Sequence, residues 1–149
     1  MEPETAMRNY LHHRKVLMVF LALNLAFEIL LYSYLFFNME YIITQLAQIY
    51  KELTVEKLHR VFLICNGIDI FINFFMYSFA FYSVLTHKAS KFSIFNSLLI
   101  IAIFSRIITS YLNVLNLLMF ILKIVLYLYS RFVLSLLFSV LLVPEIPID

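Results

Sequence analysis

Four ionisable side chains lie inside long apolar stretches of this sequence, and they are the residues most able to do chemistry there: Glu28, Asp69, Arg106 and Lys123. A charged group in the hydrocarbon of a bilayer costs about 2.5 kcal/mol or more, so it usually turns toward a partner or a cavity. Two carboxylates and two cations could form ion pairs, or they could line a path for an ion, a proton or a lipid head group. The carboxylates could also act as general acid and base, but the sequence shows no substrate site beside them.

Polar residues accompany these charges at helical spacing. In the stretch 61–85, Asn66, Asp69, Asn73 and Tyr77 follow at i, i+3, i+7 and i+11, which places them on one narrow stripe of a helix. Shorter stripes of the same kind run through the other apolar stretches. Besides the four charges, the predicted polar seam consists of Asn24, Asn66, Asn73, Tyr77, Asn113, Asn116 and Tyr127.

Four apolar stretches must position these residues, and we expect membrane-spanning helices near 16–37, 61–85, 92–112 and 117–143. The last two form one apolar run, which as a single helix would be roughly 78 Å long, far more than one bilayer. We therefore predict a turn within 109–116, which is rich in Ser, Thr and Asn. The fourth stretch is overlong, so we expect it to tilt or to break near Ser130.

The connection 38–60 is hydrophilic but contains neither Gly nor Pro. Its apolar residues recur at helical spacing: Ile42, Leu46, Ile49 and Leu53. Thr54 is a candidate N-cap for the following helix. Either the flanking membrane helices extend beyond the bilayer, or an amphipathic helix lies on its surface. The predicted fold is thus an all-α polytopic membrane protein, a four-transmembrane-helix bundle with an extended helical first outer connection, forming one membrane domain over residues 1–149.

Composition narrows the function classes. The chain is 64% hydrophobic and 13% charged, so lipid must be its solvent. No basic tract supports nucleic-acid binding. The single cysteine, Cys65, excludes an intramolecular disulfide, and no His or Cys spacing holds a metal. We find no catalytic motif and expect no metal, no cofactor and no enzymatic activity.

Four spans place both termini on one side of the membrane. Five Lys and Arg residues flank the spans on that side (Arg8, Arg14, Lys15, Lys88 and Lys91), and three lie on the other (Lys51, Lys57 and Arg60). The positive-inside rule then favours cytoplasmic termini, in an organelle that the sequence does not identify. In this topology the four buried charges lie at depths that agree within roughly 5 Å, so Asp69 is expected to meet Arg106 or Lys123.

These features favour a non-catalytic integral membrane subunit or scaffold of a membrane protein complex, whose bundle is organised by its buried charges. Its expected partners are the lipid bilayer and other membrane proteins or further copies of the chain. The first alternative is a small transporter or channel component, with the polar seam serving an ion, a proton or a lipid. The second is a lipid-modifying membrane enzyme.

Overall fold

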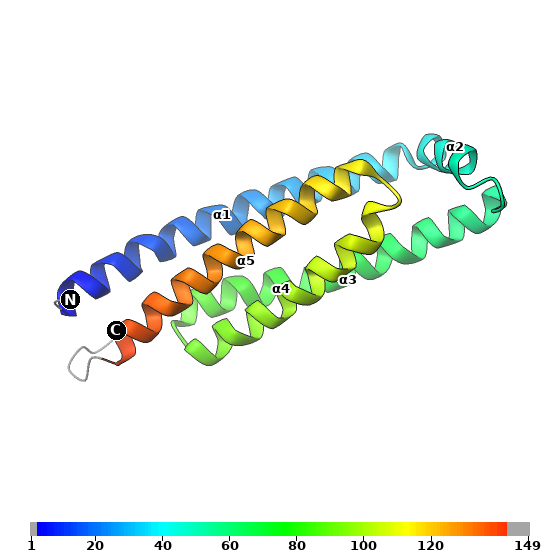
Figure 1. The fold of residues 1–149 in the computed structure, drawn as a ribbon. Coiled ribbons are helices and arrows are strands. Elements are labelled where there is room, and N and C mark those ends of the chain that lie inside the picture. Colours follow the sequence, from blue (N-terminus) through cyan, green and yellow to red (C-terminus); the bar gives the residue numbers. More distant parts are fainter. Residues whose placement is uncertain (1–2, 143–149) are drawn as a thin grey trace.

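The computed structural model describes residues 3–142, which form five helices and no strand (Figure 1). In chain order the helices are α1 (Pro3–Phe37), α2 (Met39–Ile49), α3 (Val55–Thr86), α4 (Ala89–Ser110) and α5 (Val114–Leu141). The predicted all-α class is confirmed.

Four of these helices, α1, α3, α4 and α5, are long and apolar enough to cross a membrane, which confirms the four predicted spans. Two of them begin well before the predicted limits, since α1 starts at Pro3 and α3 at Val55. The 35 residues of α1 correspond to about 52 Å, whereas the hydrocarbon core of a bilayer is about 30 Å thick. Helix α3 therefore extends into the connection 38–60, whereas α1 ends at its predicted limit and is longer only at its start.

Short polar side chains define two helix starts. Thr54 caps α3, as predicted, because its hydroxyl accepts a hydrogen bond from the backbone N–H of Lys57 at 3.4 Å. Asn113 caps α5 by accepting from the backbone N–H of Leu115 at 2.7 Å. Asn113, which the sequence places in the polar seam, lies in the turn after α4, which ends at Ser110.

The turn between α4 and α5 lies inside the predicted range but is narrower, at residues 111–113. Helix α5 then runs without interruption past Ser130, so the break considered there does not occur. The predicted end of this span, at residue 143, lies just outside the described residues.

Helix α2 is the amphipathic part of the first connection. Its residues Ile42, Ile43 and Leu46 are buried and pack with Leu58 and Phe62 at the start of α3. Of the expected apolar stripe, only Ile42 and Leu46 are buried. Ile49 and Leu53 are exposed, because α2 ends at Ile49 and Leu53 lies in the following turn.

The four long helices form a ring in the order α1, α3, α4, α5, in which each runs antiparallel to its neighbours (Figure 1). Packing around the ring is uneven: α3 on α4, α4 on α5 and α1 on α5 pack closely, whereas α1 meets α3 only sparsely. The start of α1, the α3–α4 turn and the end of α5 lie at one end of the bundle. Helix α2 and the α4–α5 turn lie at the other.

The interior contains two apolar clusters, one toward each end of the bundle. The larger includes Leu21 of α1 and Leu126 of α5. The smaller includes Leu31 of α1 and Met119 of α5, together with the buried face of α2. The segments between these residues carry Glu28 and Lys123, so the buried charges lie between the two apolar clusters.

Candidate functional site: a buried charge layer

Each of the four long helices contributes one charged side chain to a common layer. We call Glu28 of α1, Asp69 of α3, Arg106 of α4 and Lys123 of α5 the charge layer. The side chains of Asp69, Arg106 and Lys123 are fully buried, and that of Glu28 is 2% exposed. The structure therefore brings together all four charges that the sequence singled out.

Arg106 lies at the centre of the layer. Its Nη2 forms ion pairs with Oε2 of Glu28 and, at 3.0 Å, with Oδ2 of Asp69. Its Nη1 donates to Oδ1 of Asn116 on α5 at 2.7 Å. One guanidinium group thus joins the other three long helices to α4, which the planar, multidentate geometry of arginine allows.

Lys123 balances the second charge of the layer. Its Nζ forms an ion pair with Oε1 of Glu28 and donates to Oδ1 of Asn73 at 2.6 Å. The same ammonium group lies 5.0 Å from the centre of the Tyr77 ring, within the range of a cation–π interaction. Glu28 consequently lies between two cations, one on each carboxylate oxygen.

Asp69 is held by hydroxyl groups as well as by Arg106. Tyr32 of α1 donates to its Oδ2 at 2.5 Å, and Ser105 of α4 donates to its Oδ1 at 2.6 Å. The Tyr32 oxygen in turn accepts from Nη2 of Arg106 at 2.8 Å and from Nδ2 of Asn73 at 3.0 Å. Both oxygens of Asp69 therefore have partners, and Tyr32 links the carboxylate to the rest of the network.

The layer is electrically balanced, with two negative and two positive groups. Removing a charged pair from water is costly, and the cost is repaid only where the geometry is good and the remaining lone pairs are bonded. Here the opposite charges are in direct contact, and amides and hydroxyls supply further bonds. Among the described residues, Nε of Arg106 has no hydrogen-bond partner, and Oε1 of Glu28 has only its ion pair with Lys123. Chemically, this arrangement can fix the order and rotation of the four helices relative to one another.

The residues of the predicted polar seam make different contacts in the structure. Asn73 and Asn116 join the charge layer. Asn24 and Asn66 are buried, but each side-chain amide donates to a carbonyl of its own helix, at 3.0 and 2.8 Å respectively. Tyr127 is partly buried against the larger apolar cluster. Only part of the seam therefore serves the charges.

Tyr32 and Ser105 belong to the network but were not identified from the sequence. Tyr32 follows Glu28 by four residues, so it lies on the same helix face, and Ser105 directly precedes Arg106. A second polar contact was also missed: Ser130 of α5 donates to Oδ1 of Asn96 on α4 at 2.8 Å, with both side chains buried. A search for polar partners four residues from each buried charge finds Tyr32, whereas the Asn96–Ser130 contact has no charge to mark it.

A smaller group of polar contacts joins α1 to the α3–α4 turn. The Tyr10 hydroxyl and Nδ1 of His87 share a hydrogen bond of 3.0 Å, and Nε of Arg14 donates to the carbonyl of Val84 at 2.9 Å. Burial, followed by the positive charge of Arg14, lowers the pKa of His87 below its usual 6.5. These contacts hold the start of α1 against the turn.

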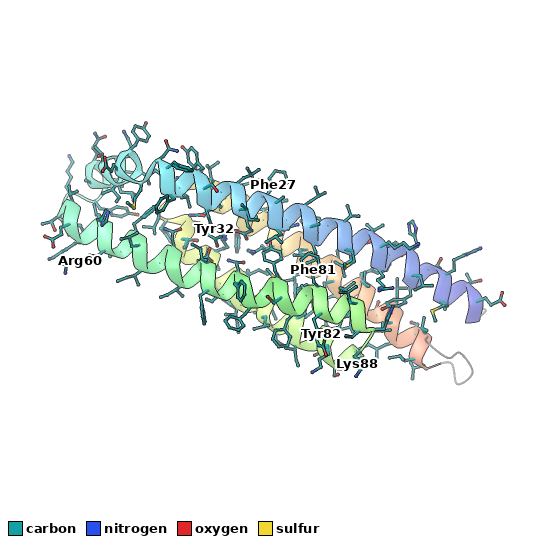
Figure 2. The ribbon with its side chains drawn as sticks, turned by 180° about the vertical axis from the view of Figure 1, so that it is seen from behind. Phe27, Tyr32, Arg60, Phe81, Tyr82 and Lys88 are labelled. Carbon is teal, nitrogen blue, oxygen red and sulfur yellow. The ribbon has the colours of Figure 1, made fainter. Side chains whose placement is uncertain are left out.

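A cavity of about 350 Å³ opens between α1 and α3 beside the charge layer. Figure 2 looks onto these two helices, with Tyr32 and Phe81 of the cavity lining labelled between them. The lining also includes Glu28 and Asn73. Among the described residues, no group of three or more His, Cys, Asp or Glu side chains is arranged to hold a metal ion.

Comparison of the chain with family models, with curated proteins and with solved structures gives no match.

Proposed function

We propose that this chain is a non-catalytic integral membrane protein that serves as a scaffold or subunit of a membrane complex. The observation that carries the proposal is the charge layer, in which one charged side chain from each long helix is buried and paired within the bundle. Groups paired in this way specify one arrangement of the helices, because any other rotation would leave a charge unpaired in an apolar interior.

The pairing of the carboxylates favours this role over ion passage. Glu28 already contacts Arg106 and Lys123, and Asp69 contacts Arg106 and two hydroxyl groups. An ion or a proton that bound either carboxylate would have to displace a partner that is itself buried and charged or hydrogen-bonded. A scaffold role, by contrast, needs these pairs to stay intact and requires no partner of Glu28 or Asp69 to be displaced.

The outer surface of α3 offers a contact area for a partner. Phe71, Phe74 and Phe75 are exposed there, and the Phe75 ring lies 4.8 Å from the Phe71 ring and 5.7 Å from the Phe74 ring. Large aromatic side chains bury much area at low entropic cost and are enriched at protein interfaces. We infer that this aromatic face contacts an apolar helix of another membrane protein or of a second copy.

Native co-purification tests the proposal. The tagged full-length chain is extracted in a mild detergent and its mass is measured, with a variant carrying Phe71→Leu, Phe74→Leu and Phe75→Leu beside it. We expect a complex larger than one chain for the wild type, and its loss in the variant. A matched control replaces the exposed rings Phe36 and Phe37 of α1 by Leu and should keep the complex. A stable solitary wild-type chain would contradict the proposal.

A second candidate is a component of a transport pathway, favoured by the cavity between α1 and α3 that reaches Glu28 and Asn73. Purified protein in vesicles would then carry protons or cations, and the flux would disappear in an Asp69→Asn/Arg106→Met double variant. Flux that persists in a double variant whose assembly is lost would exclude a pathway through these residues. Chemical conversion of lipids by the purified chain would contradict both candidates.

We also infer that the start of α1 and the end of α5 face the cytoplasm. Both lie at the end of the bundle where the α3–α4 turn carries Lys88 (Figure 1). Five Lys and Arg residues flank the spans at that end and three at the other, and cytoplasmic flanks are enriched in these residues.

A further inference from the structure

The sparse packing of α1 on α3 leaves a groove along most of their common length. One cavity of about 350 Å³ lies on the side of the α3–α4 turn, and a second of about 180 Å³ lies on the side of α2. Both are lined by Tyr32 and Ile70, so they adjoin. We call the two together the α1–α3 groove. It extends from Phe81 to Met39, past the charge layer at its centre.

The walls of the groove are apolar and reach the outer surface. Leu25 and Ile29 of α1 face Ile70, Phe74 and Phe81 of α3 across the larger cavity. Ile29, Ile70 and Phe74 are exposed by 57%, 47% and 67%. A molecule dissolved in the bilayer can therefore enter the groove from the side, between the two helices, without passing through water.

Two polar side chains that line the groove each have an atom without a hydrogen-bond partner among the described residues. Tyr77 lines the larger cavity and is 4% exposed, yet its hydroxyl has no hydrogen-bond partner among the described residues. In the smaller cavity the same is true of Oδ1 of Asn66, which is 7% exposed. Buried polar atoms are nearly always bonded, so these two mark places where a ligand's polar group is favoured.

The charge layer determines which polar group fits. Its two carboxylates and two cations already balance, so a charged head group in the groove would introduce an uncompensated charge at low dielectric. A hydroxyl group brings no net charge, and it can both donate to and accept from the Tyr77 hydroxyl. The apolar walls then suit a hydrocarbon body.

We propose that the α1–α3 groove binds one uncharged lipid with a free hydroxyl group. The hydroxyl bonds to Tyr77 beside the charge layer, and the hydrocarbon body lies against Leu25, Ile29, Ile70, Phe74 and Phe81. Sterols and diacylglycerols share this chemistry. This binding site does not require the scaffold role proposed above, although Phe74 belongs both to the groove wall and to the aromatic face of α3.

Photo-crosslinking tests the proposal on the full chain in phosphatidylcholine vesicles. The probes are a photoreactive sterol, a photoreactive diacylglycerol and a photoreactive phosphatidylcholine. We expect saturable labelling of α1 and α3 peptides by the sterol or the diacylglycerol, with competition by the same unlabelled lipid, and the two arms identify which lipid binds. Equal labelling of these peptides by the phosphatidylcholine probe, or no saturable labelling at all, would overturn the proposal.

Two variants with matched controls locate the site. Tyr77→Phe removes only the unpartnered hydroxyl and should weaken binding about three- to tenfold, the value of one neutral hydrogen bond. Tyr127→Phe, on a tyrosine outside the groove, should leave binding unchanged. Ile70→Trp fills the junction of the two cavities and should abolish saturable labelling, whereas Ile68→Trp, on a 55% exposed residue of the same helix, should not.

A folding measurement accompanies the binding measurement. Tyr77→Phe breaks no hydrogen bond among the described residues, so its unfolding midpoint should equal or exceed that of the wild type. Weaker binding at an unchanged midpoint supports a direct contact with the lipid. Unchanged binding in Tyr77→Phe and Ile70→Trp would place the lipid elsewhere and overturn the proposal.

Discussion

Arg106 is the residue on which the charge layer depends most. Its guanidinium group contacts Glu28 and Tyr32 of α1, Asp69 of α3 and Asn116 of α5. Without it, two carboxylates would remain against one ammonium group in an apolar interior. The cost of such an uncompensated buried charge exceeds the net stabilisation that the intact pair provides.

Replacing Arg106 by Met therefore tests the structural role of the layer. We expect Arg106→Met to lower the free energy of unfolding by about 3–5 kcal/mol, the range for breaking a buried ion pair from one side. Unfolding of the detergent-solubilised chain, followed by loss of helical signal as SDS is added, provides the measurement.

Two further variants control for effects other than charge balance. The double variant Asp69→Asn/Arg106→Met keeps Glu28 paired with Lys123, so it should be more stable than Arg106→Met alone. Arg60→Met removes an exposed arginine paired with Glu56 on the same helix and should change stability by no more than about 0.5 kcal/mol. A double variant that is less stable than the single one would contradict an electrostatic origin of the loss.

The sequence predicts the charges of the layer better than its hydrogen-bonding partners. Glu28, Asp69, Arg106 and Lys123 are recognisable because each is expensive in an apolar stretch and so must find a partner. Tyr32 carries no such signal, because a tyrosine suits lipid, interface and interior alike, and the chain has ten. Its role depends on the rotation of α1 about its axis, which packing determines.

At the scale of single helices, Gly67 makes α3 less stable than an alanine at the same position would. It is the only glycine of the chain, it lies in the middle of α3, and a Cβ atom added there meets nothing within 4 Å. We expect Gly67→Ala to raise the free energy of unfolding by about 0.5–1 kcal/mol, because glycine loses more backbone entropy in a helix. A lower midpoint in the same SDS titration would show that another group approaches this position closely.

The turn between α3 and α4 makes stability depend on pH through His87. The folded protein lowers the pKa of His87, chiefly by burial and then through Arg14, so the unfolded chain takes up the proton first as the pH falls. The contribution of the neutral imidazole is therefore complete above about pH 6.5 and declines below it. We expect the unfolding midpoint of the wild type to drop between pH 7.5 and pH 5.

His87→Asn isolates this effect from the other histidines. The backbone of His87 is left-handed, with φ of 52°, a conformation that asparagine tolerates better than most residues. The difference in unfolding midpoint between wild type and variant should shrink or change sign as the pH falls from 7.5 to 5. A constant difference would assign the pH dependence to other groups.

The sequence predicts which helices form more reliably than it predicts the residues at which they begin and end. Four apolar stretches and the cap at Thr54 are local signals, and the structure contains them all. The range 109–116, where the turn between α4 and α5 is predicted, has no Gly or Pro, and its Ser, Thr and Asn residues suit either a turn or the inward face of a helix. The sequence therefore favours a place for Asn113 in the polar seam, whereas in the structure its side chain caps α5.

At the scale of the whole molecule, the uneven packing around the ring of helices cannot be predicted from the sequence pattern of any single helix. The four helices all carry buried charges, yet α1 packs closely on α5 and only sparsely on α3. Glu28 reaches Lys123 across the close contact, while the open side leaves the groove lined by Tyr32 and Ile70. Such a groove depends on distances between helices, which single-helix periodicity does not determine.

The orientation of the bundle in the membrane gives the last prediction. Lys57 near the start of α3 and Lys88 in the α3–α4 turn are exposed at opposite ends of the bundle. In a Cys65→Ser background, which removes the only native thiol, each is replaced singly by Cys and treated with a membrane-impermeant maleimide in intact cells. If the protein is in the plasma membrane, we expect Lys57→Cys to react in intact cells and Lys88→Cys only after permeabilisation, because the more basic flanks stay in the cytoplasm. If it is in an organelle membrane, sealed vesicles with the cytoplasmic face outward replace the cells, and we expect Lys88→Cys to react directly and Lys57→Cys only after permeabilisation. The reverse pattern would place the start of α1 and the end of α5 on the other side and contradict the inferred topology.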